Sequence, residues 1–217
     1  MFFLLYSALV LFPKPNIICS RRDIIASSIV MSKNKQYAKT IEQQDDTVGF
    51  IRGYKNNLYY SGPITESAIF SITSNLINMQ NEDSFSNINL HMQSPGGLLL
   101  PTLGLVDLIR TSDIPINTYV DGYCASAASL ICVVGAQKIM NKYGVVLIHQ
   151  LKMGIEPSKY LEIQDQLSNA DTLTHIIKDV YLKNTKLTSE KLDELLMHDL
   201  LLNSTICKEY GIVDIII

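Results

Sequence analysis

The residues best suited to chemistry lie in three short segments within residues 93–150. The first, Ser94-Pro95-Gly96-Gly97, comes directly after a strand pattern and directly before a helical one. Paired glycines at such a junction let the backbone turn tightly and present N–H groups outward, as an oxyanion hole requires. Because an ordinary strand-to-helix turn has the same composition, this segment alone leaves both interpretations open.

The second segment, residues 122–129, surrounds a serine with small residues at the expected start of an apolar helix. Ser126 would then stand at a helix N-terminus, where its hydroxyl and the N–H of Ala127 both face a substrate carbonyl. For a lone serine, an N-cap role is the simpler interpretation. Ser129 falls one turn later, where a small packing residue is expected.

The third segment, residues 145–150, ends an apolar strand pattern with the imidazole of His149. A histidine at the end of a strand serves as a general base when a hydroxyl lies within hydrogen-bond reach. A core or surface histidine satisfied by backbone groups is the more common case. The other histidines, His91, His175 and His198, fall on an expected strand or helices without comparable surroundings.

The segments that must position these residues alternate between strand and helix patterns. Strands are predicted at residues 58–60, 88–92, 116–120 and 145–149. Helices are predicted at residues 67–79, 98–109 and 130–134, and a longer one should start near Pro157, with Ser158 close to its cap, and run to Asn184. In residues 67–79 the apolar positions are Ala68, Ile69, Ile72, Leu76 and Met79. This alternation predicts βαβ units and an α/β fold.

Length and composition exclude several classes of protein. The 217 residues, 47% hydrophobic and 18% charged, predict one folded domain, placed at residues 46–217, with a tail. The net charge of −3 provides no general attraction to nucleic acid or to an anionic membrane surface. The four cysteines, Cys19, Cys124, Cys132 and Cys207, lack C-x-x-C spacing and are interpreted as reduced, mostly buried thiols.

Residues 1–45 are interpreted as a targeting presequence or an N-terminal docking arm. The apolar run over residues 2–12 is too short to span a bilayer. No acidic residue precedes Asp23, whereas basic and hydroxyl side chains are frequent. A presequence would place the protein in a plastid or mitochondrial stroma, and the cytoplasm is the default otherwise.

Taken together, the motifs resemble the ClpP family, the proteolytic subunits of ATP-dependent Clp proteases, from about residue 57 to the C-terminus. Residues 94–97 match the family's SPGG segment, and residues 148–150 its I-H-Q segment. Residues 122–126 match its G-x-A-A-S segment, with Cys124 replacing one alanine. Residues 198–214 are similar to its last segment, R-D-x-x-x-S/T followed by A-x-E-Y-G-L-V-D.

The resemblance implies a ClpP/crotonase-like spiral of βαβ units whose long helix near the C-terminus protrudes as a handle. It implies Ser126 as nucleophile, His149 as base and Asp199 as the orienting acid. Gly96 or Gly97, together with Ala127, would supply the oxyanion donors. It also implies heptameric rings stacked into a tetradecamer and an AAA+ Clp unfoldase that consumes the ATP, so that the chain itself needs neither a cofactor nor a metal.

Other functions stay open beside this one. The chain could be a non-catalytic Clp ring subunit, or a crotonase-type acyl-CoA enzyme, which shares the spiral fold. A signal-peptide-peptidase-like enzyme would use a lysine base, which the histidine motif opposes. Residues before Asn57 lack the family's axial helix pattern, and residues 151–157 replace a glycine-rich strand that helps bind substrate peptide in the family.

Overall fold

The computed structural model describes residues 49–82, 84–154 and 159–217. Within the chain, Asp46–Ile217 forms one compact unit. The presequence or arm predicted over residues 1–45 lies outside the described residues. Pro157 and Ser158, where the long helix was expected to start, lie outside them as well.

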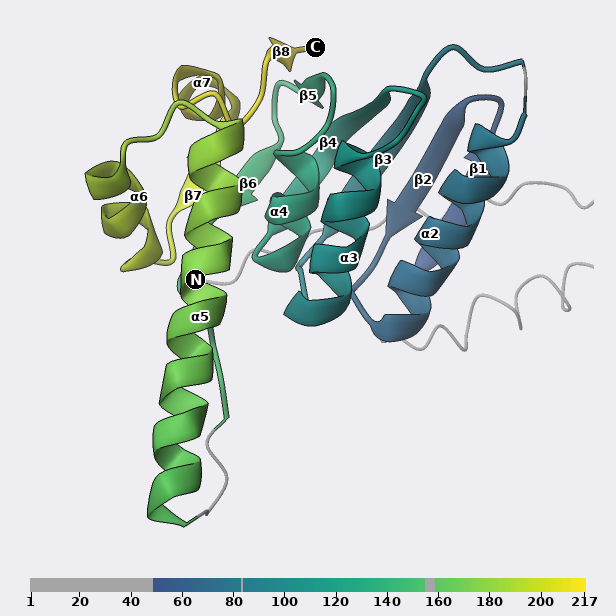
Figure 1. Ribbon diagram of the computed structural model, residues 1–217. Coiled ribbons are helices and arrows are strands. Elements are labelled where there is room, and N and C mark those ends of the chain that lie inside the picture. The colour runs from purple at the N-terminus through teal and green to yellow at the C-terminus, as the bar shows by residue number, and fades with distance from the viewer. Residues whose placement is uncertain (1–48, 83, 155–158) are drawn as a thin grey trace, which may run out of the picture. The chain divides into compact units, whose positions relative to one another are not determined.

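One mixed sheet forms the centre of the compact unit (Figure 1). Its strands are β1 (Phe50–Tyr54), β2 (Asn57–Ser61), β3 (Ile88–Ser94), β4 (Ile116–Ala125), β5 (Lys138–Met140), β6 (Val145–Leu147), β7 (Leu201–Asn203) and β8 (Ile215–Ile216). The main order is β1-β2-β3-β4-β5-β8, with β6 pairing β4 and β7. Only the β1–β2 and β6–β7 pairs are antiparallel among these strands.

Strand β4 organises the sheet because two strands share one of its edges. Its first half pairs β5, in the register Thr118↔Lys138, and its second half pairs β6, in the register Ala125↔Leu147. The other edge pairs β3 along nearly its whole length. The carboxyl ends of β3, β4 and β6 therefore meet at one place, which is where ligand sites form in α/β sheets.

Helices α2 (Glu66–Gln80), α3 (Leu99–Arg110) and α4 (Ala127–Cys132) lie along one face of the sheet (Figure 1). Helix α2 begins where the Thr65 side chain accepts a hydrogen bond from the N–H of Ala68, a typical N-cap. Its buried residues are the five predicted from periodicity. Strand β3 alternates in the same way, with Ile88, Leu90 and Met92 buried in the core.

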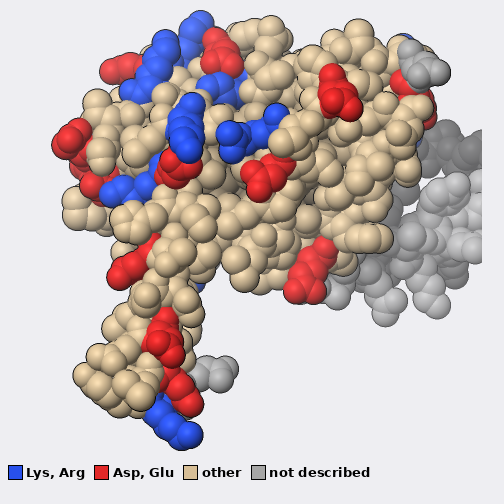
Figure 2. Space-filling view, in the orientation of Figure 1, with Lys and Arg blue, Asp and Glu red and all other residues tan. Residues whose placement is uncertain are grey.

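Helix α5 (Tyr160–Asn184) is attached to the rest of the unit by its C-terminal end alone. Of its 25 residues, Ile177, Val180 and Tyr181 are the buried ones. The N-terminal half extends away from the sheet (Figure 1), and its surface is mostly uncharged (Figure 2). At the attached end, Lys138 Nζ donates to the carbonyl of Asn184 at 2.7 Å and Lys178 pairs with Asp193 at 2.6 Å.

The α/β fold with a protruding helix is confirmed, with differences at the element ends. Strand β4 continues five residues beyond the predicted end at residue 120, because β6 pairs its extension. Strand β6 ends at Leu147, so that His149 follows the strand rather than closing it. Several short elements were not predicted: β1, β5, α6 (Ser189–Leu196), β7, α7 (Ser204–Glu209) and β8.

Acidic and basic side chains lie side by side on the face shown in Figure 2, rather than forming a continuous basic area. No helix within the described ranges is long and apolar enough to cross a membrane. Cys124, Cys132 and Cys207 are buried free thiols, as predicted, and Cys19 lies outside the described residues. Burial raises the pKa of the Cys207 thiol to about 12.

We therefore expect Cys207 to be unreactive in the folded protein. At pH 8 iodoacetamide should alkylate it at least about a thousandfold more slowly than in urea, because the thiolate is rare when the pKa is raised and common at the unfolded value of about 8.5. Mass spectrometry of peptides after timed alkylation measures both rates. Rapid modification of Cys207 in the native protein would contradict the burial.

Candidate active site

A cavity of about 370 Å³ opens where β3, β4 and β6 end. It is lined by parts of the three segments singled out in the sequence and by α5: Pro95, Gly97, Leu98, Leu99, Ser126, Ala127, Leu130, His149, Gln150, Leu151, Lys152, Ile177 and Tyr181. The residues come from four separate stretches between Pro95 and Tyr181. The sheet topology and the packing of α5 bring them together.

Ser126 occupies a strained turn between β4 and α4. Its backbone has φ 55° and ψ −128°, in the positive-φ region that non-glycine residues rarely enter. Such conformations cost about 1–3 kcal/mol and persist where the surroundings hold them. Here the Ser126 N–H donates to the carbonyl of Leu147 at 2.9 Å. This hydrogen bond holds Ser126 beside Leu147, which precedes His149 by two residues.

Gly96 and Gly97 both stand where a side chain would clash with a neighbouring segment. A Cβ added to Gly96 would lie 2.7 Å from Ser126 Cβ and 2.5 Å from the carbonyl oxygen of Ala125. A Cβ added to Gly97 would collide with the carbonyl oxygen of Ile64. Both glycines also have positive φ, of 89° and 153°. The close approach to the serine turn thus requires glycine at position 96, and the close approach to the backbone of Ile64 requires it at position 97.

The backbone N–H groups at the cavity are not equivalent. The N–H of Gly96 already donates to Ser94 Oγ at 3.1 Å. Gly97 and Ala127 line the cavity, and the described part of the chain offers no acceptor to the N–H of either residue. Ala127 is the first residue of α4, whose N–H has no partner within the helix. Two N–H groups are therefore available to a ligand.

One ring nitrogen of His149 is buried without a partner. Its Nδ1 is buried and makes no hydrogen bond within the described residues. A buried polar atom left unpaired costs about 1–3 kcal/mol. Such a group in a native structure calls for an explanation, and a catalytic role is one of those available.

Asp199 lies just before β7, whose partner β6 precedes His149, and its side chain does not line the cavity. The antiparallel register of β6 and β7 pairs Val145 with Asn203 and Leu147 with Leu201. The pairing ends at Leu147 and Leu201, so that His149 and Asp199 each lie two residues beyond the last pair. The Asp199 side chain is instead 63% exposed and pairs with Lys152 Nζ at 3.7 Å. Asp199 is not among the residues that line the cavity.

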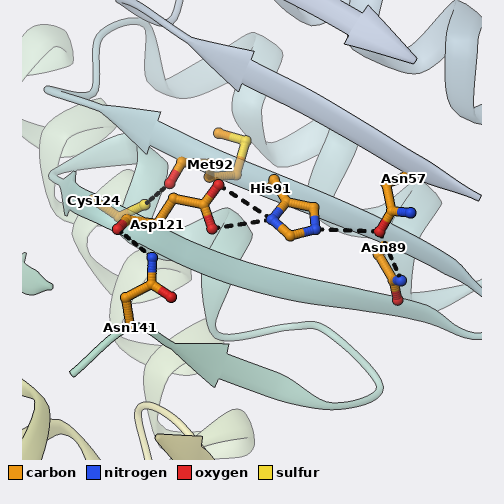
Figure 3. A network of polar contacts seen from close by, with 7 residues as sticks. All are labelled: Asn57, Asn89, His91, Met92, Asp121, Cys124 and Asn141. Atoms are coloured by element: carbon orange, nitrogen blue, oxygen red, sulfur yellow. Dashed lines mark hydrogen bonds and ion pairs between the residues drawn. The ribbon is translucent and has the colours of Figure 1, made fainter. Parts of the chain in front are cut away.

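A His–Asp pair does form elsewhere on the sheet (Figure 3). His91 Nδ1 contacts both carboxylate oxygens of Asp121, at 3.0 and 3.1 Å, while Nε2 contacts Asn57 Oδ1 at 3.3 Å. The ring stacks between Tyr59 and Tyr119. Because an amide rather than a hydroxyl occupies Nε2, this pair contains no nucleophile and serves the packing of the sheet.

The structure thus gathers Ser126, Ala127, Gly97 and His149 around one cavity and sets Gly96 directly behind the serine. Asp199 stands outside it. Sequence reasoning missed Tyr181 and Lys152, because their places depend on α5 and on the loop after β6. No group of three or more metal-binding side chains occurs within the described ranges.

Comparison with known proteins gives one consistent family. Residues 41–217 match the Clp protease family. A protein of Cyanophora paradoxa named ATP-dependent Clp protease proteolytic subunit is 26% identical over 72% of this chain and 81% of its own length. Proteins of the same name from Mesostigma viride and Oenothera elata subsp. hookeri are 28% and 31% identical. Those matches cover 64% and 61% of this chain, and 61% and 55% of the relatives.

The glycine pair provides a test of the geometry of the site. Gly96→Ala and Gly97→Ala should each lower the free energy of unfolding by roughly 1–3 kcal/mol, because each adds backbone strain and a steric clash. Thermal and urea denaturation followed by circular dichroism measure the change. Gly104→Ala is the matched control, since Gly104 lies within α3 with open space around it.

That control should raise stability by about 0.5–1 kcal/mol, the usual gain from alanine within a helix. A Gly96→Ala protein as stable as the parent would contradict the close packing of β3 against the serine turn.

Proposed function

Because the chain belongs to the Clp protease family, we propose that it is a serine endopeptidase that hydrolyses peptide bonds of unfolded proteins inside a ring-stacked chamber. Family membership confirms the resemblance inferred from the four motifs. The proposal for the chemistry goes further than membership. It rests on the meeting of Ser126, His149 and two unoccupied N–H groups at one cavity.

The proposed reaction starts with attack of Ser126 Oγ on a peptide carbonyl. His149 takes the hydroxyl proton as the C–O bond forms, and the N–H groups of Gly97 and Ala127 stabilise the oxyanion. Collapse of the tetrahedral intermediate breaks the C–N bond, and the imidazolium returns its proton to the leaving amine. Water, activated by the same imidazole, then hydrolyses the acyl-enzyme and restores Ser126.

Gly97 is favoured over Gly96 as the oxyanion donor. The N–H of Gly96 is held by Ser94 Oγ, so that using it would break an existing hydrogen bond. Gly96 instead contributes by its lack of a side chain, which lets Ser126 approach.

Asp199 is proposed as the acid that orients His149. The β6–β7 pairing supports this role, because His149 and Asp199 each lie only two residues beyond its last pair, Leu147↔Leu201. The unpaired Nδ1 of His149 is the ring nitrogen to which the Asp199 carboxylate would bind. Asp199 would have to leave Lys152 to reach it, and an exposed ion pair of this kind opposes that motion by only about 0–1 kcal/mol.

We further propose that α5 joins two heptameric rings into a tetradecamer that works with an AAA+ Clp unfoldase. The projecting half of α5 favours such an interface, because the side chains of Tyr160, Leu161 and Leu167 on it are more than half exposed. Apolar side chains on a single projecting helix gain stability when a second copy covers them. ATP would be consumed by the unfoldase, so that this chain needs no cofactor.

One observation favours a second candidate function, that of a non-catalytic Clp ring subunit. In such a subunit the pairing of Asp199 with Lys152 would be permanent and His149 would stay unoriented. The filled Ser126 and His149 positions favour the catalytic alternative.

A fluorophosphonate probe separates the two. Labelling of the purified chain should require Ser126, and Ser126→Ala should lower peptide turnover by roughly 10³-fold or more. Ser189→Ala, a change at an exposed serine of α6, is the control that should retain both activities. Native mass measured on the same samples reports ring assembly. An intact ring that takes up no label would identify a structural subunit.

The acid is tested by two further variants. Asp199→Asn should lower kcat by roughly 10³- to 10⁴-fold, as in other serine protease triads. Lys152→Gln should leave kcat unchanged or raise it up to about fivefold, because it releases an exposed carboxylate. Lys208→Gln, on an exposed side of α7, is the control for loss of positive charge. Loss of turnover in Lys152→Gln would assign the lysine a role in substrate binding instead.

A further inference from the structure

A buried hydrogen-bonded chain leads from α5 to the backbone of the serine turn. The Tyr181 hydroxyl lies 2.6 Å from Ser129 Oγ, and Ser129 Oγ lies 2.6 Å from the carbonyl oxygen of Ser126. Tyr181 is 2% exposed and Ser129 is fully buried. Nothing in the local sequence couples the two, since they stand 52 positions apart.

The groups present determine which hydroxyl donates in each of these two hydrogen bonds. A carbonyl oxygen only accepts, so the single proton of Ser129 Oγ must go to Ser126. Ser129 Oγ can then only accept from Tyr181, whose hydroxyl is therefore the donor. Burial raises the pKa of the Tyr181 phenol well above its usual value, which keeps that proton in place.

The hydrogen-bonded chain ends on the peptide unit between Ser126 and Ala127, which carries one of the proposed oxyanion donors. The Ser126 carbonyl and the Ala127 N–H belong to the same planar, resonance-coupled peptide. The carbonyl oxygen accepts a second hydrogen bond, from the N–H of Ser129 at 2.9 Å. Hydrogen bonds accepted at a carbonyl oxygen increase the polarisation of the peptide and make its N–H a stronger donor.

We propose that Tyr181 and Ser129 are positioning residues that hold the 126–127 peptide in its strained conformation and strengthen the Ala127 N–H as an oxyanion donor. The inference rests on the proposed peptidase function, because it gives Ala127 its role. Neither hydroxyl touches the substrate. The Tyr181 ring also lines the cavity, so a change that keeps the ring isolates the hydroxyl.

The simplest alternative is that Ser129 and Tyr181 merely satisfy each other in the core. Serine hydroxyls commonly bond to carbonyls one turn earlier in helices, and a buried tyrosine hydroxyl needs some partner. That alternative predicts an effect on stability alone. A positioning role predicts an effect on the chemical step and on the binding of a tetrahedral adduct.

Steady-state peptidase kinetics of Tyr181→Phe, Ser129→Ala and the double variant distinguish these cases. Tyr181→Phe should lower kcat about threefold to tenfold, and Ser129→Ala about tenfold, with KM unchanged. Because Tyr181 acts through Ser129, the double variant should be no slower than Ser129→Ala. Tyr143→Phe, at an 89% exposed tyrosine, is the matched control.

A peptide boronic acid adds a readout that core packing would not move. Its adduct with Ser126 places an oxygen in the oxyanion hole, so its inhibition constant should rise by the same factor as kcat falls. Variants with parental kcat and boronate affinity, or two effects that multiply in the double variant, would overturn the proposal.

The NMR resonance of the Ala127 amide tests the same hydrogen bonds without a measurement of peptide turnover. In protein labelled with ¹⁵N-alanine, Ser129→Ala and Tyr181→Phe should both shift the Ala127 amide nitrogen upfield, because the carbonyl of its peptide loses polarisation. An unmoved resonance would refute the relay, whatever the activity. A shifted resonance in a chain that neither turns over peptide nor takes up fluorophosphonate would instead show that the relay exists and that the peptidase function is wrong.

Discussion

The site depends on the close approach of the β3 end to the turn that carries Ser126. Three stretches of backbone, around Gly96, Ser126 and Leu147, share one small volume, and only glycine fits at the first of them. That contact fixes the positive φ of the serine, the exposure of two N–H groups and the position of His149 beside them. The rest of the sheet holds these three strand ends at the required separation.

This constraint explains which features were readable from the sequence. Glycine pairs, small residues and a histidine at strand ends are local signals, because each reflects a backbone demand at its own position. The five buried positions of α2 were predicted for the same reason, since helical periodicity depends on near neighbours alone. The family, the α/β class and the segments around the cavity followed from signals of this kind.

The features that were missed depend on distant partners. Strands β5 and β8 are three and two residues long, too short for any periodic pattern. The β1–β2 hairpin turns through Lys55 and Asn56, and the positive φ of 53° falls on the lysine, a residue that does not signal such a turn. The contacts of Tyr181 with Ser129 and of Asp199 with Lys152 join residues that only the folded chain brings together. No reading of single segments finds them.

The attachment of α5 has a mechanical consequence. From Tyr160 to Ile177 the helix extends roughly 25 Å, at about 1.5 Å per residue, before it meets buried contacts. It behaves as a lever whose fulcrum lies beside the cavity, at Ile177 and Tyr181. By the same geometry, a tilt of about five degrees at the fulcrum moves the tip by about 2 Å. A load applied at the tip is likewise concentrated on the few hydrogen bonds at the base, and one of them, from Tyr181 to Ser129, leads on through Ser129 to the peptide of Ser126.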